Sequence, residues 1–334
     1  MSNPKISEYP YWKYLASIVL FALIVSHPLF AYSVTENDKI ESQMLDESAI
    51  ILNQSANNSE KAEMIVQWEQ EQFNFPAANH FNSNNYRYYL RDYIPLPGYY
   101  LYINRANCGE LAIVFEEMAN ITNLPYRKIV TEDMLNPISM RRNNHRFSEV
   151  QLENGSWMIA DVGFNLYPPK SSKHEFTENR GYLVGHVAIK NDDGTFTDCT
   201  PSYVKNTSKI IVNAERDGVP LSNADIEVEL LYNDTKRPVI GNHIKYETDE
   251  QGIMMLNLGS YENCSYAVTV KDGFYKSSTT FVPNEDVSSV EIEVDKWNID
   301  GTVIFALLLF SIMIYPSLRF GNFIGEMLVR KRRK

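Results

Sequence analysis

The segment that decides the fold begins at residue 107 and reads NCGELAIVFEEMANITNLPYRKIV as far as residue 130. From Cys108 onward its apolar residues recur at helical spacing, which predicts a helix with one buried stripe. The stripe consists of Leu111, Val114, Phe115, Met118 and Ala119. The helix is expected to end between Asn120 and Asn123, because Pro125 does not fit a helix interior. After the proline the apolar period changes to two, which predicts a strand over residues 126–131.

Three further segments have strand periodicity, namely residues 147–152, 156–162 and 182–190. Turn residues lie between them, with Glu-Asn-Gly at 153–155 and Asn-Asp-Asp-Gly at 191–194. These short clusters predict hairpins. A helix that leads into an antiparallel sheet indicates an α+β domain. From about residue 209 only strand and turn patterns remain, which predict an all-β sandwich of about ninety residues.

Composition excludes several classes of protein. The chain has 334 residues, of which 44% are hydrophobic and 22% charged, so it is neither disordered nor collagen-like. Its length suits about two folded domains. A net charge of −11 and a pI near 5.1 argue against a nucleic-acid-binding protein, whose surface is expected to be basic. Three cysteines are too few for a disulfide scaffold.

Two apolar segments predict membrane association. Residues 14–32 carry no formal charge, and their length fits both a membrane-spanning helix and a long signal-peptide core with a weak cleavage-like site at 29–31. Residues 302–318 have the minimum length for a second span, although a buried core helix is the alternative. The basic run at 330–334 favours the span, because such residues accumulate on the cytoplasmic side.

The charge distribution predicts the topology. The two ends, 1–33 and 299–334, hold eight basic and three acidic residues, which leaves 23 basic and 39 acidic residues between them. An acidic middle and a basic tail predict that both ends lie inside and that 34–298 lies outside. Seven glycosylation sequons fall in this middle part and give weak support for a glycoprotein. They are at Asn53, Asn57, Asn120, Asn154, Asn206, Asn233 and Asn263.

Cys108 is the first candidate for chemistry, because it stands at the predicted start of a helix. The free N–H groups and the dipole at a helix N-terminus favour a thiolate and can hold an oxyanion. A thiol nucleophile also needs a base and an orienting partner, and His145 and Asp161 lie on two adjacent predicted strands. Spacing alone does not bring these two together. From the residues alone, a catalytic site is no more favoured than the alternative of a buried structural cysteine and an unrelated surface histidine.

Four blocks of sequence in order resemble the transglutaminase-like superfamily. They are Asn-Cys-Gly-Glu-Leu-Ala at 107–112, Asn-Leu-Pro-Tyr-Arg-Lys-Ile-Val at 123–130, His-Arg-Phe-Ser-Glu-Val at 145–150 and Gly-Ser-Trp-Met-Ile-Ala-Asp at 155–161. The resemblance implies a papain-like α+β core with Cys108 as nucleophile, His145 as general base and acid, and Asp161 as the residue that orients the imidazole. Two positions depart from the family pattern: Ala106 replaces a glycine and Phe147 replaces a tryptophan.

The second half of the ectodomain carries a separate resemblance. Residues 209–294 resemble a carboxypeptidase-regulatory-like sandwich, through Asp-Gly-Val-Pro at 217–220, Glu-Thr-Asp-Glu-Gln-Gly at 247–252 and Tyr-Ala-Val-Thr-Val at 266–270. Such modules are spacers or binding units, so no catalysis is expected there. The resulting domain plan is a signal peptide or signal-anchor helix at 1–33, a polar stalk at 34–58, the transglutaminase-like catalytic domain at 59–205, the β-sandwich at 206–298, a transmembrane helix at 299–319 and a basic cytoplasmic tail at 320–334.

Other residues are weaker candidates. Glu149 is expected to be a structural partner, with Arg127 as the candidate cation. His174 and His186 are expected to be satisfied by the sheet or by water. Residues 86–91, which are rich in Tyr and Arg, fit a substrate cleft or plain packing. Asn104 and Asn107 are possible oxyanion donors on proximity alone, and Ser59 is expected to cap a helix that runs to about Phe73.

Neither a metal nor an organic cofactor is expected, because the sequence has no HExxH, CxxC or acidic-loop motif. Cys199 and Cys264 fit either a disulfide or two separate buried thiols.

The predicted function is that of a membrane-anchored, extracytoplasmic thiol enzyme that acts on amide bonds of a protein or peptide substrate. Hydrolysis is favoured over crosslinking, because water is always available as the second reactant. The alternative is a non-catalytic peptide-binding or adhesion scaffold of the cell surface. A cysteine-dependent sensor is less favoured, because the tail after the second span is too short to form a signalling domain.

Overall fold

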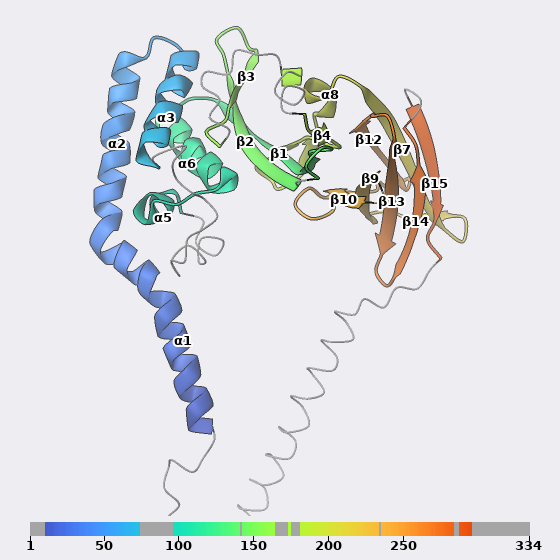
Figure 1. Ribbon diagram of the computed structural model, residues 1–334, viewed down its shortest axis with the longest axis horizontal. Helices are drawn as coiled ribbons and strands as arrows, with labels where there is room; N and C mark the ends of the chain where they lie inside the picture. Colours follow the sequence, from blue (N-terminus) through green and yellow to red (C-terminus); the bar gives the residue numbers. More distant parts are fainter. Residues whose placement is uncertain are drawn as a thin grey trace, which may run out of the picture. The chain divides into compact units, whose positions relative to one another are not determined.

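The computed structural model describes residues 11–73, 96–140, 142–163, 173–174, 181–233, 235–283 and 287–295. It divides the chain into two compact units. The first contains Met1–Thr207 together with Asn257–Gly259, and the second contains Ser208–Leu256 and Ser260–Lys334. The first unit combines helices with an antiparallel sheet, and the second is built from strands (Figure 1).

One long helical rod forms the N-terminal part of the first unit. Helix α1 (Tyr11–Ala31) continues through a π-helical turn, η2 (Tyr32–Glu36), into α2 (Asn37–Gln54), as Figure 1 shows. The predicted polar stalk at 34–58 is therefore wrong, because this region is largely helical. Helix α2 has buried residues at every helical turn, namely Ile40, Met44, Ser48 and Ile51. That spacing gives one face that packs against the core.

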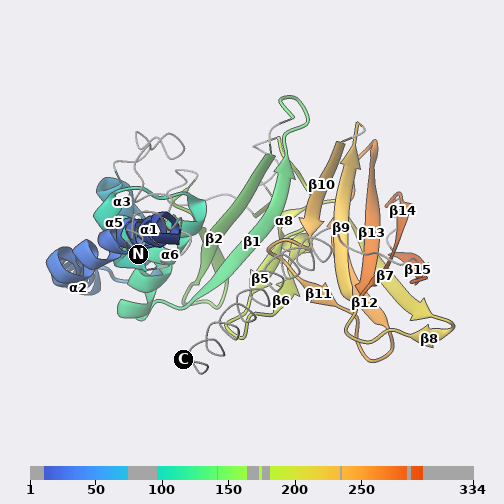
Figure 2. The same cartoon turned by 90° about the horizontal axis from the view of Figure 1, so that it is seen from below.

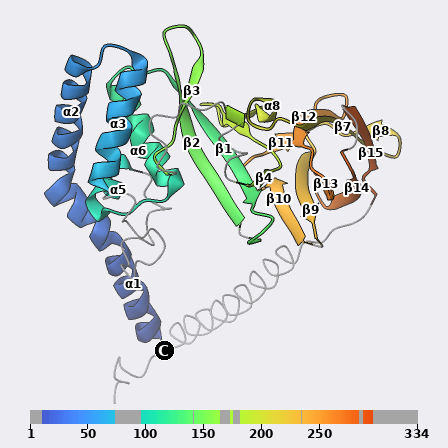
Figure 3. The ribbon, with the colours of Figure 1, turned by 45° about the horizontal axis from the view of Figure 1, so that its top comes forward.

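Three further helices complete this layer: α3 (Asn58–Gln72), α5 (Pro97–Ile103) and α6 (Cys108–Ile121). The N-cap of α3 is Asn57 and not the expected Ser59, since the Asn57 side chain accepts a 2.9 Å hydrogen bond from the backbone N–H of Glu60. The predicted stripe of α6 is confirmed, because all five of its apolar side chains are buried. Figure 3 shows these helices gathered beside the strands β2 and β3.

The sheet of the first unit has the order β3-β2-β1-β5-β6, with β4 paired to β1. The strands are β1 (Tyr126–Leu135), β2 (Arg142–Gln151), β3 (Trp157–Ala160), β4 (Leu183–Val184), β5 (Ala188–Lys190) and β6 (Phe196–Asp198), followed by helix α8 (Thr200–Tyr203). The single strand expected at 182–190 is split into β4 and β5. The split occurs because the backbone of Val187 bonds to Thr200 and Cys199 and not to β1.

The second unit contains two sheets. One has the order β10-β9-β13-β14 with β11 paired to β9, and the other has the order β12-β7-β15 with β8 paired to β7. Figure 2 shows β10, β9 and β13 side by side. The strands are β7 (Thr207–Arg216), β8 (Val219–Pro220), β9 (Asp225–Tyr232), β10 (Thr235–Ile240), β11 (Tyr246–Glu247), β12 (Ile253–Gly259), β13 (Cys264–Asp272), β14 (Tyr275–Phe281) and β15 (Val287–Glu293). Alternate residues of β7, β9 and β13 are buried, which is the pattern of a sandwich.

Within the described residues, one helix is long and apolar enough to cross a membrane. It spans residues 14–54, which is 41 residues, and its apolar part is exposed. An anchor and a signal sequence both have this property. The second predicted span at 302–318, the basic run at 330–334 and the Tyr/Arg-rich residues 86–91 lie outside the described residues.

Candidate active site

Cys108 is the first residue of α6, and its position is fixed by a capping box. The Asn107 side chain accepts a 2.9 Å hydrogen bond from the N–H of Gly109 and a 3.4 Å bond from that of Glu110. The Glu110 carboxylate in turn accepts a hydrogen bond from the N–H of Asn107. Three backbone donors at the helix start are thereby satisfied, and the backbone on both sides of the thiol is fixed. Asn107 is therefore a helix cap in this structure.

His145 and Asp161 are brought together by the hairpin of β2 and β3. Ser148 pairs with Ala160, so Asp161 follows one residue after the last pair of the ladder. The imidazole Nε2 lies 2.7 Å from Asp161 Oδ2, and the exposed fraction of each side chain is 1%. Because Nε2 faces the carboxylate, Nδ1 is the nitrogen that remains for the thiol. The Cys108 thiol is hydrogen-bonded to this imidazole, and its Sγ lies 3.7 Å from the carbonyl oxygen of Asn144.

The environment of the thiol favours its ionised form. Burial raises the pKa of Cys108. The hydrogen bond and the positive charge of His145, together with the backbone of Arg146, lower the pKa by a larger amount than burial raises it. The net result is a pKa below the ordinary value for cysteine. The helix N-terminus acts in the same direction, because its partial positive charge stabilises an anion.

The imidazole is stabilised in its protonated form. Burial alone lowers the pKa of His145, but the charge and hydrogen bond of Asp161, followed by those of Cys108, raise it to about 9. A cysteine with a lowered pKa beside a histidine with a raised pKa favours transfer of the thiol proton to the imidazole, which gives a thiolate–imidazolium pair. Such a pair is the ground state of an activated thiol nucleophile.

Aromatic rings hold the imidazole from one side. The ring of Phe147 stacks on that of His145, with centroids 5.3 Å apart and planes at 25°. Tyr203 then contacts Phe147 edge-on, with centroids 5.7 Å apart. Phe147 therefore gives the histidine an aromatic contact.

Glu149 lies deeper on the same strand, and it is a structural partner as predicted. Its fully buried carboxylate accepts hydrogen bonds at 2.5 Å from Arg127 and from the Tyr203 hydroxyl, and it forms an ion pair with Lys173. Arg127 also lies over the ring of Trp157, at 4.3 Å from the ring centroid. These contacts join β1, β2, β3 and α8 behind the candidate site.

A second ion pair ties the strand of the histidine to the helix of the cysteine. The Nη2 atom of Arg146 donates to both carboxylate oxygens of Glu116, at 2.8 and 2.7 Å. Arg146 directly follows His145 in β2, and Glu116 lies in the middle of α6. The pair therefore fixes the helix that begins at Cys108 against the strand that carries the imidazole.

Glu69 on α3 is a buried carboxyl group that sequence reasoning missed. Its exposed fraction is 0%, and neither of its oxygens has a hydrogen-bond partner within the described part of the chain. Burial, followed by the charges of Glu116 and Asp161, raises the pKa of Glu69 well above its ordinary value. This shift favours the protonated, uncharged form of Glu69 beside Asp161. In the sequence, the neighbours Ile65, Val66 and Trp68 gave no sign that Glu69 would be buried.

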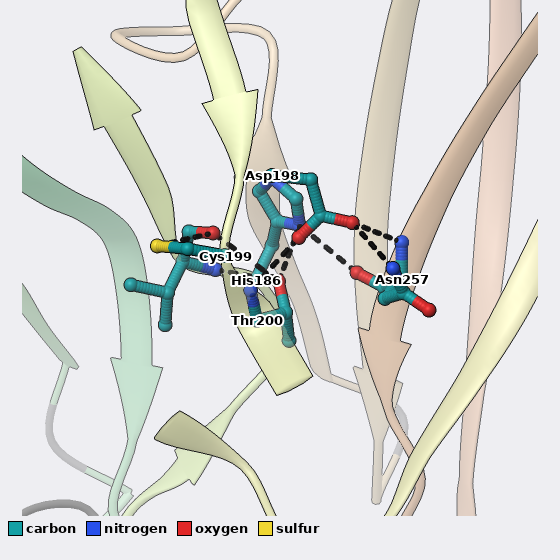
Figure 4. A network of polar contacts seen from close by, with 6 residues as sticks. His186, Asp198, Cys199, Thr200 and Asn257 are labelled. Carbon is teal, nitrogen blue, oxygen red and sulfur yellow. Dashed lines mark hydrogen bonds and ion pairs between the residues drawn. The ribbon is translucent and has the colours of Figure 1, made fainter. Parts of the chain in front are cut away.

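His174 and His186, the two weaker histidine candidates, have hydrogen-bond partners, as expected. Figure 4 shows the buried His186, whose Nδ1 lies 2.9 Å from Thr200 Oγ1 and 3.0 Å from the Asn257 carbonyl oxygen. Asp198 Oδ2 in turn accepts hydrogen bonds from the backbone and side-chain nitrogens of Asn257, at 2.6 and 2.8 Å. His174 Nε2 lies 3.1 Å from the carbonyl oxygen of Pro201. Burial lowers the pKa of His186, so it is neutral at pH 7.

Cys199 and Cys264 are both free, buried thiols. Burial raises the pKa of Cys199 to about 12 and that of Cys264 to about 11. Cys108, which is half-buried, thus differs from both in exposure and in acidity. In the described ranges, no group of three His, Cys, Asp or Glu side chains is arranged to hold a metal ion.

Comparisons with known proteins identify no family for this chain. No protein-family model matches the sequence, and no curated protein matches it. Among solved structures, the chain is a weak neighbour of a transglutaminase from red sea bream, with 10% identity and a TM-score of 0.32. That alignment covers 73% of this chain and 57% of the transglutaminase.

Two bacterial structures are also weak neighbours. The C-terminal domain of the shaft pilin SpaA from Lactobacillus rhamnosus GG has 14% identity and a TM-score of 0.21, over 27% of this chain and 97% of that domain. The Bacillus anthracis TIE protein has 14% identity and a TM-score of 0.22. That alignment covers 52% of this chain and 31% of the TIE protein.

Proposed function

We propose that this chain is a membrane-anchored thiol enzyme that acts on amide bonds through a thioester on Cys108. The observation that carries the proposal is the buried 2.7 Å contact between His145 Nε2 and Asp161 Oδ2, with the thiol of a helix-terminal cysteine hydrogen-bonded to the same imidazole. The environments of Cys108 and His145 support these proposed roles.

In the first half of the reaction, the Cys108 thiolate attacks the carbonyl carbon of an amide, and the carbonyl oxygen takes the negative charge. The Asn107 cap takes the N–H groups of Gly109 and Glu110, so the N–H of Cys108 and the positive end of the α6 dipole are the groups proposed to stabilise this oxyanion. The His145 imidazolium then gives its proton to the departing amine as the C–N bond breaks. A thioester on Cys108 and a neutral imidazole remain.

In the second half, the neutral imidazole of His145 takes a proton from the incoming nucleophile, which attacks the thioester carbonyl. The C–S bond then breaks, and the Cys108 thiolate leaves beside the imidazolium, so the starting pair is restored. With water the product is a carboxylic acid, so the enzyme is a peptidase or amidase. With the amine of a lysine the product is a new amide, so the enzyme is a crosslinker. We favour hydrolysis, because water is always present and no second substrate site is evident in the described residues. Asp161 keeps Nε2–H oriented throughout.

The proposed location is the cell membrane, with the catalytic domain outside and the C-terminal tail in the cytoplasm. The N-terminal segment acts as an uncleaved anchor in this proposal. The support is structural: α1 runs through η2 into α2 without a break, and Tyr32 is buried against Tyr99 and Tyr102. A continuous helix at Ala31 is unsuitable for a protease that needs an extended cleavage site.

The test uses the full chain in detergent and a peptide that carries a thiol-reactive group. Labelling is expected on Cys108, and it should be absent in Cys108→Ala and strongly reduced in His145→Ala. Cys199→Ala is the matched control, because it removes a buried thiol outside the site and should leave labelling unchanged. A peptide library with and without added lysine analogue then separates hydrolysis from amine transfer. Equal labelling of wild type and Cys108→Ala would favour the non-catalytic scaffold.

A further inference from the structure

Gly163 lies against all three residues of the candidate site. A Cβ atom built on Gly163 would lie 3.2 Å from Cys108 Cβ, 3.3 Å from His145 Cε1 and 3.4 Å from Asp161 Oδ1. The first two distances are tighter than about nine in ten contacts that real Cβ atoms make, and the third is an ordinary van der Waals contact. A side chain at position 163 would therefore crowd Cys108 and His145.

The backbone conformation does not explain the glycine. Gly163 is outside the left-handed region, which is where a glycine is favoured for its backbone alone. Gly194 illustrates the other situation, since its φ is +88° and nothing lies within 4 Å of an added Cβ. The requirement at Gly163 is therefore one of space.

The neighbours of Gly163 have little freedom to move away. The Cβ of Cys108 is fixed to the helix start by the capping box of Asn107 and Glu110. The His145 ring is held between the Asp161 carboxylate and the ring of Phe147. An added methyl group must therefore shift the imidazole or the thiol by a few tenths of an ångström.

We propose that Gly163 is a positioning residue of this site, whose missing side chain lets the His145 imidazole approach the Cys108 thiol while it stays bonded to Asp161. The inference rests on the proposed function, because it concerns the same thiol and imidazole. It assigns to Gly163 a role that none of the four sequence blocks contains, since the last block ends at Asp161. The glycine acts through the geometry of its neighbours and does not touch substrate.

The expected effect of Gly163→Ala is a weaker thiolate–imidazolium pair. A displacement of about 1 Å in a catalytic geometry costs about a hundredfold in rate, so a few tenths of an ångström should cost about five- to tenfold. The loss should be largest below pH 7, where the imidazolium is needed to keep the thiol ionised. The pH at which Cys108 reaches half its maximal alkylation rate should shift upward.

The experiment measures the iodoacetamide reaction rate of Cys108 against pH in the full chain, with wild type, Gly163→Ala and Gly194→Ala. Gly194→Ala is the matched control, because the same methyl group strains a left-handed backbone in the β5–β6 turn, far along the chain from the triad. It should lower the melting temperature and leave the alkylation profile unchanged. An upward shift in Gly163→Ala alone supports the proposal.

The outcomes separate this proposal from the proposed function. If wild type has an acidic, fast-reacting Cys108 and Gly163→Ala has the same profile, the positioning role is wrong and the thiol enzyme stands. If wild-type Cys108 reacts no faster than an ordinary thiol, both proposals fail.

A double-mutant cycle covers the case in which Gly163→Ala loses stability but still folds. His145→Ala removes the Cε1 atom, so Gly163→Ala should cost less stability in that background than in wild type. An equal cost in both backgrounds would show that the imidazole is not what Gly163 makes room for, and it would overturn the proposal.

Discussion

Replacement of Asp161 by asparagine tests the electrostatic origin of the activated thiol. In the folded chain the pKa of His145 is raised from 6.5 to about 9, and the Asp161 carboxylate is the first of the groups that raise it. This shift corresponds to about 3 kcal/mol in favour of the imidazolium, at about 1.4 kcal/mol per pKa unit. An asparagine keeps the size of the side chain but removes the charge. We therefore expect the thiolate–imidazolium population at neutral pH to fall by about 30- to 100-fold in Asp161→Asn.

The assay is the rate of Cys108 alkylation at pH 6.5, measured by peptide mapping of the full chain. Cys199 and Cys264 are internal references, since both are buried and burial raises their pKa values to about 12 and about 11. They should stay unreactive in both proteins and thereby show that the variant is folded. An Asp161→Asn rate within about twofold of wild type, with these two thiols still protected, would refute the assigned role of the carboxylate.

Three further predictions concern stability and processing. Glu69→Gln should flatten the fall in melting temperature between pH 5 and 8. Because the folded pKa of Glu69 is raised, the stability that its protonated form contributes is complete below the unfolded pKa of 4.5 and is lost as the pH rises through the folded pKa. An equal slope in both proteins would contradict the buried, protonated carboxyl. Asn107→Ala should lower the free energy of unfolding by about 1 kcal/mol in a denaturant titration, because the cap of α6 is lost, and an unchanged value would contradict the capping role. An N-terminal epitope tag should remain on the mature chain in a blot of membrane fractions, since the helix is continuous at Ala31. A mature chain without the tag, together with a small tagged fragment that ends near Ala31, would identify a cleaved signal peptide.

The parts of the fold with a clear apolar period were predictable from sequence. The stripe from Leu111 to Ala119 and the turns at 153–155 and 191–194 have the predicted structure, because period and turn chemistry are local properties. Helix α2 was missed, since its four buried residues stand among polar ones and include Ser48. Its helical conformation is stabilised by packing, which the local pattern does not record.

The candidate site was predictable as a set of residues and not as a geometry. Cys108 carries a local signal, because a capping residue precedes it at the start of an apolar helix. The contact between His145 and Asp161 depends on the register of β2 and β3, and a one-residue slip would turn one side chain to the other face. Gly163 and Glu69 gave no signal, because their roles depend on the atoms around them.

Direct detection of an acyl-enzyme tests the central claim, which is that Cys108 forms a thioester with the help of His145. The full chain would be incubated with an activated acyl ester, quenched in acid and mapped by mass spectrometry. We predict one acyl group on Cys108 that hydroxylamine removes, no such group in Cys108→Ala, and much slower formation in His145→Ala. Acylation spread over lysines, or equal amounts in wild type and Cys108→Ala, would contradict the account.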